Sequence, residues 1–114
     1  MGNMTTYPVS TTASGVVVVR PEGRLNMPAA PGLRQQLLDL VEEGNARLVV
    51  DLAGVESIDS SVLGVLLVGL KAAKRAGGDL RMAAPSKQVA TVLELTHLKQ
   101  VLPAYPSADD AFAE

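Results

Sequence analysis

The residues best placed for chemistry are an aspartate and two serines in a row, Asp59, Ser60 and Ser61, immediately ahead of an apolar run. The run has helical periodicity, which predicts a helix over residues 60–76. Aspartate or serine at such a start is typical of an N-cap, whose side-chain oxygen accepts hydrogen bonds from backbone N–H groups that the first turn leaves free. The cluster therefore puts a serine at the positive end of a helix dipole, where an added phosphate would be tolerated.

A serine on a strand-to-helix turn is also the nucleophile of many hydrolases, in a G-x-S-x-G motif. That motif is absent around Ser60, where the sequence reads IDSSV. The single histidine, His97, lies at the end of a predicted helix, where histidine more often interacts with the dipole than acts as a base. The nucleotide-binding motifs G-x-x-x-x-G-K and G-x-G-x-x-G are also absent. We therefore expect no catalytic residue and no enzymatic activity.

The densest acidic group consists of Asp51, Glu56 and Asp59, and carboxylates of this kind would suit Mg²⁺. A structural interpretation is favoured, in which Asp51 ends a strand and Asp59 caps a helix. The chain has no cysteine and one histidine, which excludes a thiolate site and a histidine cluster. The sequence predicts neither a metal nor a cofactor.

Strands and helices that position the cluster alternate along the chain. The expected strands are residues 5–12, 16–20, 47–51, 79–84 and 98–104. The expected helices are residues 31–44, 60–76, 86–96 and 107–112, the third with Val89, Val92, Leu93 and Thr96 facing inward. This alternation predicts an α/β fold with a mixed, largely parallel sheet, because parallel neighbours need crossover connections of about this length.

The helix predicted after the serines presents a polar arc that contains Ser60, Gly64 and Lys71 when its residues are placed at 100° intervals. Leu67 and Val68 fall beside this arc instead of on the core face. They are either scattered surface residues, which are common, or an apolar patch next to Ser60 that marks a binding surface. The sequence leaves both interpretations open.

The composition limits the classes of partner. With 114 residues, 47% of them hydrophobic, the chain is expected to form one domain over residues 1–114, with residues 1–6 loose. A net charge of −2 and only two tyrosines and one phenylalanine argue against direct nucleic-acid binding. The chain starts with no signal-peptide pattern, and its longest apolar run is too short to span a membrane. We expect a cytoplasmic protein without membrane insertion.

The segment VVDL, followed by a short spacer and IDSSVLGVLL, resembles the signature of STAS domains, the bacterial anti-sigma factor antagonists or anti-anti-sigma factors. GRLN, APGLRQQL, GGDLRMAAPSKQVATVLELTHL and YPSADDAFAE also follow the order of that family. The resemblance implies a STAS fold, a mixed sheet of four or five strands with about four helices mostly on one side. It maps the phosphorylated serine of the family onto Ser60. Two positions depart from the family pattern, Val62 where glycine is usual and Asn26 where aspartate is usual.

The resemblance implies a phosphorylation-controlled binding module. Unmodified protein would bind an anti-sigma factor with serine kinase activity and so release a sigma factor. Phosphorylation of Ser60 would end this binding, and a serine phosphatase would restore it. A homodimer is compatible with this role. The candidate partner-binding residues are Asn26, Asp59, Ser60, Ser61, Gly64, Leu67, Val68 and Lys71.

The alternative is a constitutive STAS adaptor, such as the small subunit of a lipid-transport ATPase or a part of a larger signalling assembly. In that case the same helix would hold a permanent partner. Ser60 would then serve only to cap the helix.

Overall fold

The computed structural model describes residues 7–112, so the expected looseness of residues 1–6 lies outside the described part of the chain. The strands are β1 (Val9–Thr11), β2 (Val17–Val19), β3 (Gly23–Leu25), β4 (Arg47–Asp51), β5 (Val55–Ile58), β6 (Asp79–Ala83) and β7 (Ala104–Tyr105). The α-helices are α1 (Ala30–Glu42), α2 (Ser60–Arg75) and α3 (Lys87–Leu95), and 3-10 turns cover Met27–Ala29 and Leu98–Gln100. The predicted α/β class is confirmed.

Five strands form the main sheet in the order β1-β2-β4-β6-β7. Strand β1 is antiparallel to β2, and the other neighbours are parallel. In the centre, Val17 lies opposite Leu48, and Leu48 lies opposite Leu80. Buried β-branched and aliphatic residues are typical of parallel strands that are covered on both faces. The mixed, largely parallel sheet is thus as predicted, although the first strand is shorter than the expected residues 5–12.

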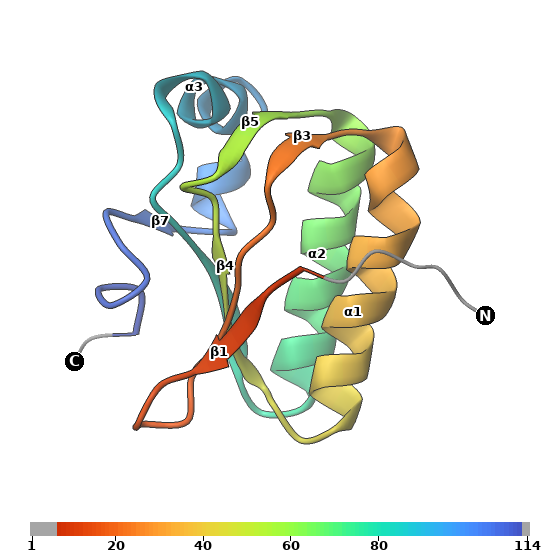
Figure 1. Ribbon diagram of the computed structural model, residues 1–114, viewed down its shortest axis with the longest axis vertical. Coiled ribbons are helices and arrows are strands. Elements are labelled where there is room, and N and C mark those ends of the chain that lie inside the picture. Colours follow the sequence, from red (N-terminus) through yellow and green to blue (C-terminus); the bar gives the residue numbers. More distant parts are fainter. Residues whose placement is uncertain (1–6, 113–114) are drawn as a thin grey trace.

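Different parts of the chain cover the two faces of the main sheet (Figure 1). Helices α1 and α2 lie side by side on one face, where Leu48 and Val50 of β4 join the larger core. On the opposite face, Val49 and Ala83 form a smaller core with the C-terminal segment. Because side chains of a strand alternate between faces, β4 contributes to both cores. This packing fixes α2 against the sheet over its whole length.

A separate two-stranded sheet, β3 with β5, carries the loops at the start of α2. The two strands are parallel, and Leu25 pairs with Ile58 at their carboxyl ends. Both side chains are buried. Since the strands end together, the residues that follow them, Asn26 and Asp59, emerge at the same edge. The sequence predicts only a short connection before Asp59, and β5 corrects that prediction.

The prediction of a strand over residues 98–104 is wrong for most of its length. Leu98 begins a 3-10 turn, and pairing with β6 is limited to Ala104–Tyr105. Pro103, which has no N–H to donate, directly precedes this short strand. Thr96 is exposed instead of facing inward, because α3 already ends at Leu95.

The expected helix over residues 107–112 is also wrong, because these residues form successive turns. The Asp110 N–H donates to Ser107 Oγ at 3.3 Å, as in a helix cap, but the segment is too short to propagate a helix on its own. Contacts with the sheet hold it instead. Arg81 donates to the Ala111 carbonyl at 2.7 Å, and its guanidinium carbon lies 4.2 Å from the centre of the Phe112 ring.

Substitution by alanine is expected to have opposite effects on stability at two glycines. A Cβ on Gly78 would lie 2.0 Å from the Ala46 carbonyl oxygen, a backbone atom that cannot move away easily. A Cβ on Gly64 would meet open space. Gly78→Ala is therefore expected to destabilise the fold by about 3 kcal/mol, at the upper end of overpacking costs. Gly64→Ala is expected to stabilise it by about 0.8–1 kcal/mol through helix propensity.

Urea denaturation followed by circular dichroism measures both free energies of unfolding under identical conditions. Changes of the same sign in the two variants would contradict the packing described here.

Candidate functional site at the start of helix α2

The cluster predicted to do chemistry forms the first turn of α2, and Asp59 is its N-cap. The Asp59 backbone is extended, so its side chain folds back over the turn, where Oδ1 accepts hydrogen bonds from the Val62 N–H at 3.2 Å and the Ser61 hydroxyl at 2.6 Å. The Asp59 N–H donates to the Leu25 carbonyl at 3.1 Å. The expected capping role of Asp59 is confirmed.

These hydrogen bonds also determine the charge of Asp59. The Ser61 hydroxyl, as the largest contribution, holds the pKa of the Asp59 carboxyl below its ordinary value against a smaller, opposing effect of burial. The backbone N–H groups of Val62 and Met27 lower this pKa further. Asp59 is therefore ionised at neutral pH, and it is its backbone N–H, bonded to the Leu25 carbonyl, that connects the start of α2 with the end of β3.

The two serines of the cluster differ in their availability. Ser61 is half-buried, and its hydroxyl donates to Asp59. Ser60 is exposed, and its hydroxyl has no hydrogen-bond partner within residues 7–112. No histidine or carboxylate of the described chain is hydrogen-bonded to it as a general base would be. Of the two serine hydroxyls, the one on Ser60 is thus the accessible one.

The loop that follows β3 adds two exposed residues to this end of the molecule. Asn26 is exposed, and its side chain makes no capping hydrogen bond to the 3-10 turn that it precedes. Met27 is 70% exposed, which is unusual for a large apolar side chain, and its N–H is among the groups that lower the pKa of the Asp59 carboxyl. Sequence reasoning missed Met27. The signal available for it was a methionine in a predicted loop, which by itself is weak.

The remaining candidates extend along α2 away from the serines. Gly64 and Lys71 are exposed, whereas Leu67 and Val68 are half-buried. Leu67 packs against the larger core, so the two apolar residues flank the exposed stripe and do not form a fully exposed patch. At 1.5 Å per residue, Lys71 lies about 16 Å along the helix from Ser60. The structure therefore groups Gly64 with the serines and places Lys71 well away from them.

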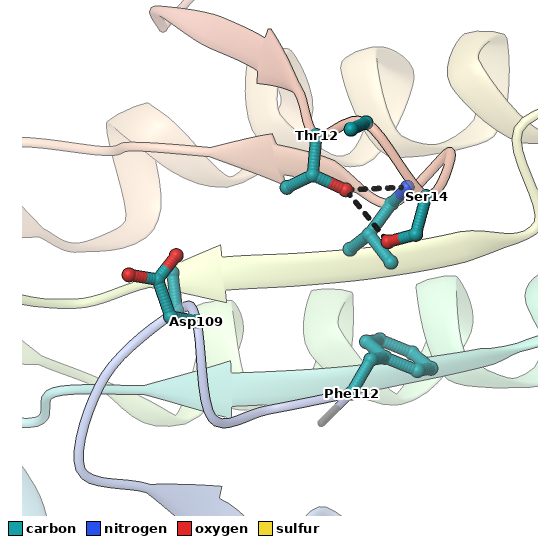
Figure 2. Close-up of a pocket in the computed structure, with 7 residues that line it drawn as sticks. Thr12, Ser14, Asp109 and Phe112 are labelled. Atoms are coloured by element: carbon teal, nitrogen blue, oxygen red, sulfur yellow. Dashed lines mark hydrogen bonds between the residues drawn. The ribbon is translucent and has the colours of Figure 1, made fainter. Parts of the chain in front are cut away.

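A cavity of about 320 Å³ lies on the opposite face of the main sheet, between the β1–β2 turn and the C-terminal segment (Figure 2). Thr12 and Ser14 hydroxyls lie 3.1 Å apart, and Thr12 Oγ1 also accepts from the Val16 N–H at 3.1 Å. Asp109 and Phe112 line the other side. The threonine and serine hydroxyls hold the turn together, so they already have a structural role.

Within residues 7–112, no three histidine, cysteine or acidic residues cluster as metal ligands would. Asp51 Oδ1 accepts a hydrogen bond from the Ala53 N–H at 3.0 Å, and Asp51 Oδ2 lies 3.5 Å from Arg20 Nε. These contacts give the carboxylate a structural role at the end of β4. None of the helices in this part of the chain combines the length and apolar character needed to cross a membrane.

The molecule is a small α/β domain of the STAS type. It has a mixed sheet with two helices on one face, and the helix that begins with the serines starts next to the loop after β3. The family model described as the STAS domain matches residues 7–111, and the chain belongs to this family. The predicted resemblance and the predicted fold are both confirmed, with fewer helices than the expected four among the described residues.

Three relatives illustrate the similarity. The anti-sigma-B factor antagonist of Bacillus subtilis is 33% identical over 86 residues, covering 75% of this chain and 78% of that protein. The crystal structure of a Thermotoga maritima protein, provisionally described as an anti-sigma factor antagonist, matches with a TM-score of 0.85 and 30% identity, covering 92% of this chain and 90% of that chain. An anti-sigma factor antagonist from Mycobacterium paratuberculosis matches with a TM-score of 0.82 and 31% identity, covering 93% and 89%.

The cap at Asp59 predicts a pH-dependent stability. Because the pKa of Asp59 is lowered in the folded protein, its ionised form stabilises the fold above the unfolded pKa of about 3.9, and this stabilisation is lost as the pH falls through the lower folded value. Asp59→Asn should therefore lower the urea midpoint at pH 7, and the difference from wild type should shrink below about pH 4.

Ser86 provides a matched control, because its hydroxyl caps α3 by accepting from the Val89 N–H at 3.2 Å and carries no charge. Ser86→Ala should cost about 0.5–2 kcal/mol at both pH values. An Asp59→Asn deficit that persists unchanged at pH 3 would contradict the assigned role of the carboxylate.

Proposed function

We propose that this protein is an anti-sigma factor antagonist whose binding is controlled by phosphorylation of Ser60. Unmodified protein binds an anti-sigma factor that is also a serine kinase, and a sigma factor is released. The kinase then phosphorylates Ser60, and a serine phosphatase restores the binding form. The relatives named above as antagonists support this role. The observation that carries it is the exposed hydroxyl of Ser60, which has no hydrogen-bond partner among residues 7–112, beside the occupied hydroxyl of Ser61.

The exposed residues around Ser60 suit contact with a protein when the serine is unmodified. Gly64 lies one turn along α2 and leaves open space beside the serine, so a partner can approach the helix backbone. Met27 adds a large apolar side chain at the same end of the molecule. A phosphate would introduce a dianion into this contact, and removing it from water without a matching cation is costly.

Phosphorylation would leave the fold itself intact. The cap of α2 comes from Asp59, so modification of Ser60 removes no hydrogen bond that holds the helix. A phosphate at this position would also lie near the positive end of the helix dipole, which favours negative charge by about 0.3–1 kcal/mol at an exposed site. The switch therefore acts through charge and desolvation at the surface, without refolding.

The two departures from the family pattern fall in different environments. Val62 is fully buried, so it faces the core and leaves the surface around Ser60 unaltered. Asn26 is exposed in the loop after β3, whose end pairs with the strand that precedes Asp59, and the usual aspartate would carry a charge there. Of the two, Asn26 is thus the residue that would adapt this chain to its own partner. A role in releasing a sigma factor would be exercised in the cytoplasm.

Phosphate transfer to Ser60 is the direct test. Incubation with ATP and candidate anti-sigma kinases, followed by peptide mass mapping, should place one phosphate on Ser60. Ser61→Ala should still accept it, because the Ser61 hydroxyl is not the acceptor, and Ser60→Ala should not. Phosphate found on another residue would overturn the proposed site.

Binding of the anti-sigma factor, measured by calorimetry, should be weakened about tenfold or more by Ser60→Asp, which corresponds to about 1.4 kcal/mol. Ala13→Asp is a suitable control, because it adds the same charge at an exposed residue of the β1–β2 turn and should leave affinity unchanged. A Ser60→Asp variant that binds like wild type would contradict the switch. A transport ATPase as the stable companion in native cells would favour the constitutive adaptor instead.

A further inference from the structure

An open groove runs beside the second half of α2, away from the serines. It has a volume of about 510 Å³, and its lining residues are Leu67, Leu70, Lys71, Lys74, Arg75 and Val101. Val101 follows the 3-10 turn after α3 and is 53% exposed, while Leu70 is almost completely buried. The groove therefore has an apolar floor between two different elements, with an exposed apolar side chain on one wall.

Three cations of α2 line the same groove. Lys71, Lys74 and Arg75 are all exposed, and the ion pairs found among residues 7–112 involve other residues. Lys74 and Arg75 lie in the last turn of the helix, where cations offset the dipole, but Lys71 lies about one turn earlier. The dipole also gives no account of the exposed Val101 on the other wall. A ligand with apolar groups flanked by carboxylates would match both features.

We propose that this groove is a docking site for an acidic amphipathic helix of a protein partner. Apolar side chains one turn apart on such a helix would enter the groove between α2 and Val101, as in other helix-in-groove complexes. Its acidic residues would pair with Lys71, Lys74 and Arg75. The concave shape favours a helix with protruding side chains over a flat membrane surface, for which the apolar floor would be inaccessible.

The site is separate from the phosphorylation switch. Lys74 lies about 21 Å along α2 from Ser60, which exceeds the Debye length of about 8 Å at physiological salt. A phosphate on Ser60 would therefore leave the groove open and its charges largely unaffected. The surface proposed for the anti-sigma factor shares Leu67 and Lys71 with the groove, whereas Lys74 and Val101 belong to the groove alone.

The test uses a fluorescein-labelled peptide of about 18 residues, long enough to form a helix, with leucines on one face and glutamates on the other. Its fluorescence anisotropy should rise on titration with the full chain, and the affinity should fall as salt is raised from about 0.05 to 0.5 M. Lys74→Glu and Val101→Asp, which alter the groove, should each weaken peptide binding about tenfold. Two controls should leave it unchanged: Lys87→Glu, which reverses a charge at the start of α3, and Ser60→Asp. Circular dichroism should show all four variants folded.

A peptide with lysines in place of the glutamates should not bind. The inference is overturned if that peptide binds equally well, if neither peptide binds, or if Lys74→Glu and Val101→Asp bind the acidic peptide like wild type. Binding to vesicles of anionic phospholipid without binding to the peptide would also overturn it. So would self-association, detected by sedimentation and abolished by Val101→Asp, without peptide binding. None of these outcomes depends on whether the anti-sigma factor binds at Ser60.

Discussion

The hydrogen bonding of one carboxylate determines the geometry at the start of α2. Asp59 caps α2, occupies the hydroxyl of Ser61, and donates its own N–H to the Leu25 carbonyl at the end of β3. It thereby fixes the first turn of the helix and ties it to the end of that strand. It also distinguishes the two adjacent serines, since it occupies the hydroxyl of Ser61, whereas the hydroxyl of Ser60 has no hydrogen-bond partner among the described residues.

The helix that carries this site is held rigidly by the rest of the domain. Gly69 lies on α2 and allows both α1 and β6 to pack closely against this helix. A Cβ at Gly69 would meet Leu80 Cδ1 of β6 at 2.9 Å and Leu37 Cδ1 of α1 at 3.0 Å. The pairing of β3 with β5 then aligns the loop after Leu25 with the start of the helix. In the proposed switch, a charge added to this first turn would alter what the surface can bind while the backbone stays in place.

Sequence reasoning predicts the longest and most regular elements well, because their patterns are strong. The run after Asp59 is periodic over four turns and has a clear cap, so both α2 and the exposure of Ser60 follow from it. Strand β5 could not be predicted, because Glu56 and Ser57 interrupt its apolar pattern and its existence depends on pairing with β3. The C-terminal turns likewise depend on Arg81, which is distant in sequence. The half-burial of Leu67 and Val68 could not be predicted either, because it depends on how neighbouring elements pack against α2.

At Gly64, the proposed function and the stability of the helix would favour different residues. It occupies an exposed position inside α2 where a methyl group would meet nothing, so the packing of the described chain does not require a glycine there. Evolution towards thermal robustness alone would replace it, since alanine is the better helix former. In the proposed binding mode, the smaller residue leaves a flat contact area beside the serine at the expense of intrinsic helix stability.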